Sequence, residues 1–302
     1  MNRWLAAGSL LLAGQCALVI ALYWPQVFDP PEVGAPQFSS FTPDAVDEIY
    51  VGDEYDNETL LLRAGQRWLL PELENLPADG DMVAKLLQAL TRGDTTWPVA
   101  ESVAARQRFQ VANYYYQRRV QLLGEGEVLG TFLLGTSPGF RKIHVRNASQ
   151  DAIYTIAFNA FDAPGHSGAW LDRRLLQVRT PLSITADSYS LHWQDGQWRS
   201  GMGRQPDERE LEALLAALRN LQVDGIADGD RQRDLAQAEA ELVLQVESLG
   251  ASVSLELFTL GGHHYIFSSE YPLFFTISAY DYERLTDIDF RLISGERMRD
   301  GQ

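Results

Sequence analysis

The sequence predicts an α+β fold, in which an N-terminal transmembrane helix precedes two similar α+β repeats, each an antiparallel sheet with a packed amphipathic helix. Three observations lead to this prediction: an uncharged opening run, a Pro-rich stretch after it, and a pattern of hairpin, helix and alternating strands that occurs twice at a spacing of roughly 130 residues. The predicted segments are a transmembrane anchor (1–24), an extended linker (25–43), a first repeat (44–178), a second repeat (179–290) and a charged C-terminal tail (291–302).

The anchor prediction depends on residues 4–24, which contain no charged residue. A helix of that length is about 31 Å long and spans a bilayer core of about 30 Å. Arg3 precedes the run, whereas Asp29 and Glu32 follow it, so the positive-inside rule places the N-terminus in the cytoplasm. We therefore predict a single-pass protein of the inner (cytoplasmic) membrane with its body on the periplasmic side. A cleaved signal peptide is the alternative.

Small residues recur every four positions within the predicted anchor. Ser9, Ala13, Ala17 and Ala21 would lie along one face of the helix, and small faces let membrane helices approach closely. We interpret this face as a contact for a partner helix. The alternative is that alanine is simply common in membrane spans.

The Pro-rich stretch, residues 25–43, has no amphipathic period and predicts an extended linker. Beyond it, each predicted repeat begins with a strand hairpin whose Gly-Gln turn, at 65–66 or 196–197, leads to a tryptophan, Trp68 or Trp198. A helix with a leucine-rich stripe follows in each repeat, and alternating strands follow the helix. The stripe residues are Met82, Val83, Leu86, Leu87 and Leu90 in the first repeat and Leu211, Leu214, Leu215, Leu218 and Leu221 in the second.

Charge and composition exclude several classes of function. With 41 acidic against 25 basic residues the net charge is -16, which repels nucleic acid. The single cysteine, Cys16, has no partner for an internal disulfide. His263 and His264 are neighbours on a predicted strand and face opposite ways, so they do not share a metal ion. Residues 135–139 (GTSPG) lack the Lys and the helix of a phosphate-binding loop. We predict neither a metal nor a cofactor.

One loop combines the residue types of a hydrolase. Asp162, His166 and Ser167 lie within six positions of one another, and a nucleophilic serine needs a base within hydrogen-bond reach and an acid behind it. Adjacent His and Ser side chains usually point apart, and Ser167 does not stand in a Gly-x-Ser-x-Gly motif. We favour a simple turn, and an envelope hydrolase that uses this loop remains the alternative.

Three consecutive tyrosines, Tyr114, Tyr115 and Tyr116, form a second candidate site. On a strand, neighbours face opposite sides, so at least one ring would reach the surface. An exposed tyrosine suits contact with a protein or stacking on a sugar, and burial at a sheet end is the alternative. A cell-wall glycan-binding module is the corresponding functional reading.

Several short motifs, in a fixed order, resemble the bacterial family catalogued as domain of unknown function 4340. The motifs are 66–68 (QRW), 97–102 (WPVAES), 109–111 (FQV), 133–135 (LLG), 144–146 (HVR), 152–155 (AIYT) and 170–175 (WLDRRL). The resemblance implies a membrane-anchored envelope protein, often associated with ABC transporters, and it supplies no catalytic residues. We therefore predict an extracytoplasmic accessory protein without catalysis of its own, whose partners are the membrane and a protein such as a transporter subunit.

Overall fold

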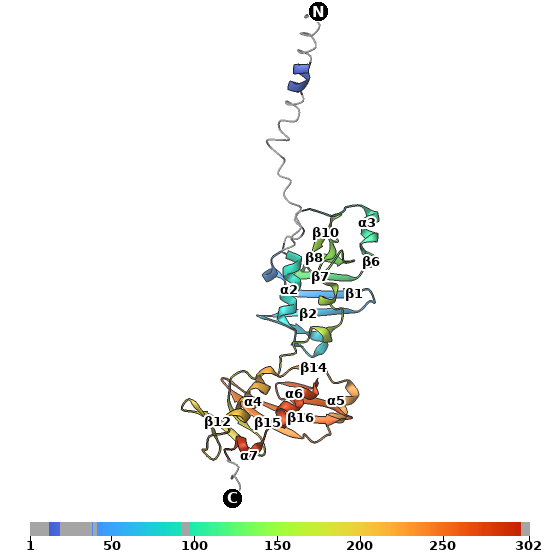
Figure 1. Cartoon of the computed structure of the whole chain (residues 1–302). Helices are drawn as coiled ribbons and strands as arrows, with labels where there is room; N and C mark the ends of the chain where they lie inside the picture. Colours follow the sequence, from blue (N-terminus) through green and yellow to red (C-terminus); the bar gives the residue numbers. More distant parts are fainter. Residues whose placement is uncertain (1–11, 19–37, 39–40, 92–96, 297–302) are drawn as a thin grey trace, which may run out of the picture. The chain divides into compact units, whose positions relative to one another are not determined.

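The computed structural model describes residues 12–18, 38, 41–91 and 97–296 (Figure 1). The chain folds as two compact units. The first unit comprises Met1–Asp56 and Lys85–Ala163, and the second comprises Asn57–Ala84 and Pro164–Gln302.

Strands dominate the described residues, and most belong to two eight-stranded sheets. The first sheet has the order β10-β9-β8-β7-β1-β2-β3-β4. Its strands are β1 (Glu48–Asp53), β2 (Glu58–Ala64), β3 (Arg67–Leu70), β4 (Leu76–Pro77), β7 (Arg118–Gly124), β8 (Glu127–Leu134), β9 (Ile143–Asn147) and β10 (Ile153–Ile156). A separate small hairpin joins β5 (Val111–Ala112) to β6 (Tyr115–Tyr116).

The second sheet has the order β13-β12-β11-β15-β16-β17-β18-β14. Its strands are β11 (Pro181–Thr185), β12 (Ser190–Gln194), β13 (Gln197–Ser200), β14 (Val223–Ile226), β15 (Leu242–Ser248), β16 (Ala251–Leu260), β17 (His263–Ser268) and β18 (Tyr271–Ile277). The order β13-β12-β11-β15-β16-β17-β18 matches β3-β2-β1-β7-β8-β9-β10 of the first sheet position by position. The two sheets differ in their eighth strand, because β4 lies beside β3 whereas β14 lies beside β18.

Both sheets contain the tight hairpin that the Gly-Gln pairs predict. Ala64 pairs with Arg67 around Gly65, and Gln194 pairs with Gln197 around Gly196. Gly65 and Gly196 have φ angles of 63° and 77°, in the left-handed region that glycine adopts without a steric penalty.

Helices are short and few by comparison. They are α2 (Gly80–Thr91), α3 (Val103–Arg108), α4 (Glu208–Asn220), α5 (Gly229–Leu235), α6 (Ala279–Thr286) and α7 (Phe290–Ile293), with 3-10 turns η1 (Pro43–Ala45), η2 (Pro71–Leu73), η3 (Ala160–Asp162) and η4 (Ser167–Trp170). In the second unit α4 and α6 lie side by side over the sheet (Figure 1). Asp207 begins α4 by accepting hydrogen bonds from the backbone of Arg209 and Glu210.

The predicted fold class, α+β, is therefore wrong, because two large antiparallel sheets make up most of the described structure. The α+β class was predicted because each repeat contains a leucine-striped helix beside its strands. Both helices exist, and Leu86, Leu90 and Leu218 are fully buried on them. They are nevertheless single elements beside eight-stranded sheets.

The predicted transmembrane helix and inner-membrane localisation are also contradicted. Within the described ranges, no helix is long and apolar enough to cross a membrane. Residues 12–18 form a helical stretch in which Ala13 and Ala17 are exposed, and the rest of the predicted anchor, with Ser9 and Ala21, lies outside the described residues. The long helix was predicted because residues 4–24 contain no charged residue. The contact role of the four small residues stays a prediction.

Two predicted segments are described only in part. Phe38 falls within the predicted linker and is buried, with its ring centroid 5.3 Å from that of Phe132 and 5.4 Å from that of Tyr154. In the predicted tail, Ile293 is buried, and residues 297–302 lie outside the described residues. The predicted repeat boundaries stay a prediction.

The buried stripe of α4 gives a test of the fold. Replacing Leu218 by Ala should lower the free energy of unfolding by about 2–5 kcal/mol, because it leaves a cavity in a closely packed core. The matched change Arg209→Ala, at an exposed position of the same helix, should stay within about 0.5 kcal/mol of the original protein. Denaturant unfolding measures both. Equal stability of the two variants would contradict the assigned packing of α4.

Candidate binding sites

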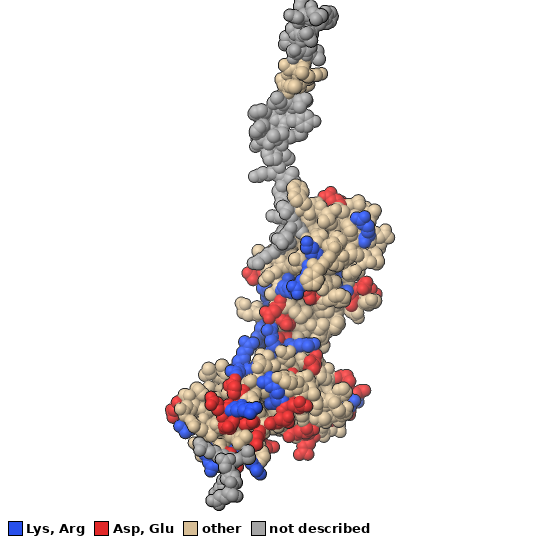
Figure 2. Space-filling view, in the orientation of Figure 1, with Lys and Arg blue, Asp and Glu red and all other residues tan. Residues whose placement is uncertain are grey.

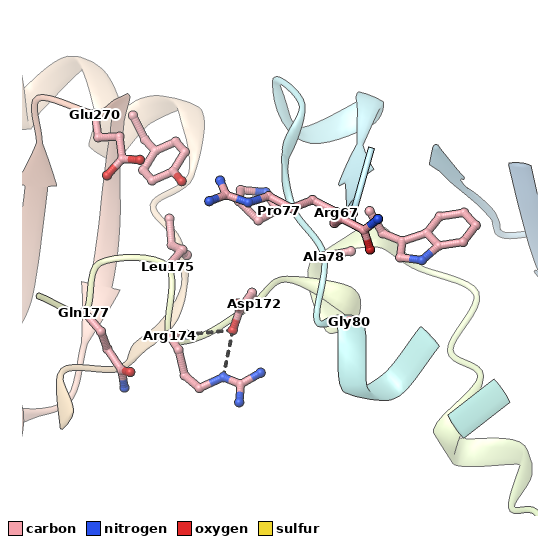
Figure 3. A pocket seen from close by; sticks show the side chains of 12 residues that line it. Arg67, Pro77, Ala78, Gly80, Asp172, Arg174, Leu175, Gln177 and Glu270 are labelled. Atoms are coloured by element: carbon pink, nitrogen blue, oxygen red, sulfur yellow. Dashed lines mark hydrogen bonds and ion pairs between the residues drawn. The ribbon is translucent and has the colours of Figure 1, made fainter. Parts of the chain in front are cut away.

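A polar cavity of about 380 Å³ lies in the second unit (Figure 3). Residues of β3 and β4 line it together with the stretch after η4 and the turn between β17 and β18. The charged side chains among its lining residues are Arg67, Asp172, Arg174 and Glu270. The cavity therefore presents both signs of charge.

Arg174 is the centre of this charged group. Its guanidinium donates to Asp172 at 3.1 Å, to Asp81 at 3.1 Å and to Asp79 at 3.5 Å. These contacts raise the pKa of Arg174, with the hydrogen bond to Asp172 as the largest cause. Figure 3 shows Arg174 beside Asp172 at the edge of the cavity. The same Asp79 oxygen accepts the backbone N–H groups of Asp81 and Met82 at the start of α2.

This ionic cluster stabilises the fold by joining Arg174 to Asp172 and to the start of α2. Each of the three aspartates contacts Arg174, and Asp79 also accepts backbone N–H groups. The described part of the chain contains no group of three or more His, Cys, Asp or Glu residues placed to hold a metal ion. Burial, followed by the nearby Glu270 carboxylate, raises the pKa of Tyr271 at the cavity wall. A phenol with a raised pKa stays protonated and acts as a hydrogen-bond donor.

The structure does not join the three residues of the proposed hydrolase loop into a catalytic group. Asp162 forms an ion pair with Lys85, His166 is exposed, and Ser167 begins the 3-10 turn η4. Among the described residues, no hydrogen bond links the His166 ring to Ser167 or Asp162. The surrounding loop is held by its backbone, since Trp170 Nε1 donates to the carbonyl of Pro164 at 2.8 Å.

The histidine pair on β17 has two different environments. His264 stacks on Tyr282 with ring centroids 4.1 Å apart, and its Nδ1 lies 3.3 Å from the Thr259 hydroxyl. His263 is exposed at the start of the strand. Neither imidazole belongs to a metal-binding group of the described residues.

The three tyrosines differ in exposure, and Tyr114 lies in the turn before β6. Tyr114 is 76% exposed at the tip of the β5–β6 hairpin and Tyr115 is 45% exposed. Tyr116 instead packs against a small core that includes Ala105, Val111, Leu133 and Ile153. Two of the three candidate binding residues therefore reach solvent.

The elements around that small core carry further exposed apolar side chains, which the sequence argument missed. Trp97, Val99 and Val103 are 76%, 50% and 73% exposed. Val99 is tied to β10 by a backbone hydrogen bond to Ile153, and α3, which begins at Val103, packs against β5. We call Trp97, Val99, Val103, Tyr114 and Tyr115 the aromatic surface. In Figure 2 the region of the first unit around α3 and β6 is mostly uncharged.

All three residues of the motif at 144–146 are buried in the first unit, and two of them, His144 and Arg146, are polar. Burial lowers the pKa of His144. Its Nδ1–H donates to the Thr136 carbonyl at 2.8 Å, and its ring stacks on Phe109 with centroids 4.1 Å apart. Arg146 is 2% exposed and donates to the carbonyls of Val111 and Gln150 at 2.7 and 2.8 Å. Both side chains therefore contact and position the backbone around them.

These features define a β-rich protein of two related sheets, with ionic and aromatic clusters at its surface. The chain belongs to the family described as "Domain of unknown function (DUF4340)", whose model matches residues 68–242. This confirms the resemblance drawn from the short motifs. Neither the curated proteins nor the solved structures contain a match to the chain.

The ionic cluster gives a stability test. Arg174→Ala should lower the free energy of unfolding by about 1–2 kcal/mol, because Asp79 and Asp172 are only a quarter exposed and lose their cation. The neighbouring change Arg173→Ala should cost less than about 0.5 kcal/mol, since its contact with Asp224 is exposed and 4.0 Å long. Chemical denaturation compares the two. A larger cost at Arg173 would refute the structural role of Arg174.

A buried phenol gives a pH test. Tyr189 lies beside a cavity of about 490 Å³, its hydroxyl has no hydrogen-bond partner among the described residues, and burial raises its pKa to about 12. Because the unfolded value is 10.0, the folded state holds this proton more tightly, and stability should fall as the pH rises from about 10 to about 12.

Tyr189→Phe should therefore reduce the fall in the free energy of unfolding at alkaline pH by up to about 2–3 kcal/mol. At pH 7 it should not destabilise the protein, because the hydroxyl it removes is buried without a partner among the described residues. The control Tyr280→Phe, on a 65% exposed side chain, should leave the pH profile unchanged. Unfolding curves at a series of pH values test this, and identical profiles for both variants would contradict it.

Proposed function

We propose that the protein is a non-catalytic interaction protein, an auxiliary component of an ABC-type transport or envelope system that acts by binding another protein. The observation that carries this proposal is the aromatic surface of the first unit. Large exposed apolar side chains on neighbouring elements are typical of protein-binding surfaces, in which Tyr and Trp are enriched.

The composition of the aromatic surface favours a protein partner over a glycan. Tyr114 and Trp97 offer flat rings that suit either ligand, but Val99 and Val103 offer only aliphatic contacts. A sugar hydroxyl beside an aliphatic side chain loses a hydrogen bond to water, whereas an apolar side chain of a partner protein does not. The transport or envelope setting comes from the family resemblance.

The surface is also held in place by hydrogen bonds and an ion pair. Ser102 caps α3 by accepting from the Ala105 backbone N–H at 3.2 Å, and Arg106 forms an ion pair with Asp151. The Tyr115 hydroxyl accepts from Gln110 Nε2 at 2.6 Å. A partner would therefore meet a preformed surface, which lowers the entropic cost of binding.

Site-specific crosslinking tests this proposal. A photoreactive phenylalanine analogue at position 114 should crosslink the full-length protein to a transporter subunit in cells, identified by mass spectrometry. The same analogue at position 280, which is also exposed but lies in the second unit, is the matched control. Trp97→Ser with Val103→Ser should reduce the adduct at position 114 at least tenfold, because the removed side chains supply the apolar contact.

Three results would contradict the proposal. The first is an equal adduct at positions 114 and 280. The second is an adduct that survives the Trp97→Ser and Val103→Ser changes. The third is recovery of cell-wall glycan in place of protein, which would favour the glycan-binding reading of the same surface.

A further inference from the structure

The first unit contains a second cavity, of about 510 Å³, that differs from the aromatic surface in chemistry. Its walls are the loop between β8 and β9 and the segment around η3, and its floor is the start of β7. The charged and aromatic side chains that matter here are those of Glu54, Arg118, Phe140, Arg141, Lys142 and Phe161. We call this the aromatic–cationic pocket.

The charge of this pocket is opposite to that of the whole protein. The chain has 25 basic and 41 acidic residues, yet the pocket is lined by three cations and one acid, Glu54. Within the described residues no ion pair joins Arg118, Arg141 or Lys142 to a carboxylate. Acids are available nearby, since Asp162 is in η3, but Asp162 is bound by Lys85. The pocket therefore keeps a local positive charge on an acidic molecule.

Two phenylalanines at the pocket are almost fully exposed. Phe140 is 88% and Phe161 is 82% exposed, on opposite walls of the cavity. The guanidinium of Arg141 lies over the Phe140 ring, 5.2 Å from its centroid, so charge and apolar surface are presented together. Exposed phenylalanines are unfavourable in water, and a pair of them beside these cations indicates a ligand with both an anionic and an apolar part.

The backbone of both walls is fixed. On one wall, Gly135 donates to the His144 carbonyl and His144 donates to the Thr136 carbonyl, each at 2.9 Å. A Cβ at Gly135 would lie 2.0 Å from the Phe109 carbonyl oxygen, so only glycine fits there. On the other wall, Arg118 Nε donates to the Ala163 carbonyl at 2.9 Å, which ties the segment after η3 to β7.

The tip of the first wall is strained at the residue that carries the charge. Arg141 has a φ of 52°, in the left-handed region that a residue with a Cβ disfavours. The turn is closed by the Lys142 backbone N–H, which donates to the Gly139 carbonyl at 3.2 Å, and by the Ser137 hydroxyl, which donates to the same carbonyl at 2.7 Å. Strain of this kind persists where the surroundings impose it, and it is common at ligand sites.

We propose that the aromatic–cationic pocket binds an anionic amphiphile, whose phosphate or carboxylate group contacts Arg118, Arg141 and Lys142 and whose apolar part contacts Phe140 and Phe161. This site is separate from the aromatic surface, so the two proposals stand or fall independently. An anionic lipid headgroup with its chain and a soluble amphiphilic anion share this chemistry.

The first test is calorimetric titration of the full-length protein with monododecyl phosphate below its critical micelle concentration. Dodecyl maltoside, which has the chain without the charge, and inorganic phosphate, which has the charge without the chain, should each bind at least tenfold more weakly. Equal binding of dodecyl maltoside would overturn the proposal, because the cations would then contribute nothing.

Matched variants assign the binding to the pocket. Arg141→Glu with Lys142→Glu should weaken binding of monododecyl phosphate at least tenfold. Arg179→Glu with Arg209→Glu, exposed in the second unit, changes the net charge by the same amount and should leave affinity within twofold. Phe140→Ser with Phe161→Ser should also weaken binding at least tenfold, and Leu249→Ser, on an 81% exposed side chain, is its control.

The substituted residues are all exposed, and a melting curve for each variant confirms folding. Pocket variants that fold and bind within twofold of the original protein would overturn the proposal. Co-sedimentation with phosphatidylcholine vesicles, with and without phosphatidylglycerol, distinguishes the two sources. Pocket-dependent binding to the anionic vesicles identifies a lipid headgroup, and pocket-dependent binding to the monomer alone identifies a soluble anion.

Discussion

The organisation of the first unit depends on a buried arginine whose guanidinium group is hydrogen-bonded to backbone carbonyls. The Arg146 guanidinium donates to the carbonyls of Val111, Ala148 and Gln150 and to the side chain of Asn113. A buried cation without such acceptors would cost several kcal/mol, so the hairpin and the turn must stay where their oxygens surround it. Burial lowers the pKa of Arg146, and its ordinary value is so high that the group remains charged.

This constraint reaches the surface through short connections. Val111 belongs to β5, and Asn113 directly precedes the exposed Tyr114. The turn around Gln150 precedes β10, to which Val99 is joined by a backbone hydrogen bond. The segments that carry the aromatic surface are therefore held by hydrogen bonds to one buried cation, Arg146. His144, two residues before Arg146, holds the backbone of Thr136, which stands between Gly135 and Ser137 in the lining of the aromatic–cationic pocket.

The motifs shared with the family thus contain residues that stabilise the fold. Trp170 is fully buried with its indole N–H bonded to a carbonyl, and Arg174 joins the aspartates that begin α2. Polar residues of this kind are costly to bury unless every donor finds an acceptor, which gives them little freedom to change. Their spacing identifies the family while revealing nothing about a ligand.

The sequence predicted local features better than global ones. The Gly65 and Gly196 turns and the leucine-rich stripes are set by neighbours within a few positions, and the structure contains them. The fold class failed because strand pairing joins residues far apart, so the number of strands in a sheet is not visible in local periodicity. The apolar run at residues 4–24 misled for a related reason, since low charge alone does not establish a spanning helix.

Tyr114 and Tyr115 were among the candidate site residues, but nothing local joined them to Trp97 or Val103. The segments that carry them contribute Ala100, Ala105 and Tyr116 to a small core that includes Leu133 and Ile153, which come from later strands. The loop with Asp162, His166 and Ser167 shows the converse case. Its residues are close in sequence, yet Asp162 is bound by Lys85, 77 positions away.

The aromatic–cationic pocket shows why function is harder to read than fold in this chain. Residues 135–139 match a phosphate-binding loop only in composition, and they lack the lysine and the helix that the motif requires. In the structure, the cations come from positions just beyond that run and from β7, and the second phenylalanine comes from η3. A net charge of -16 argues against anion binding for the molecule as a whole, but over distances beyond about 10 Å salt screens those charges. A bound anion would respond chiefly to the nearest groups, and at this pocket those groups are cationic.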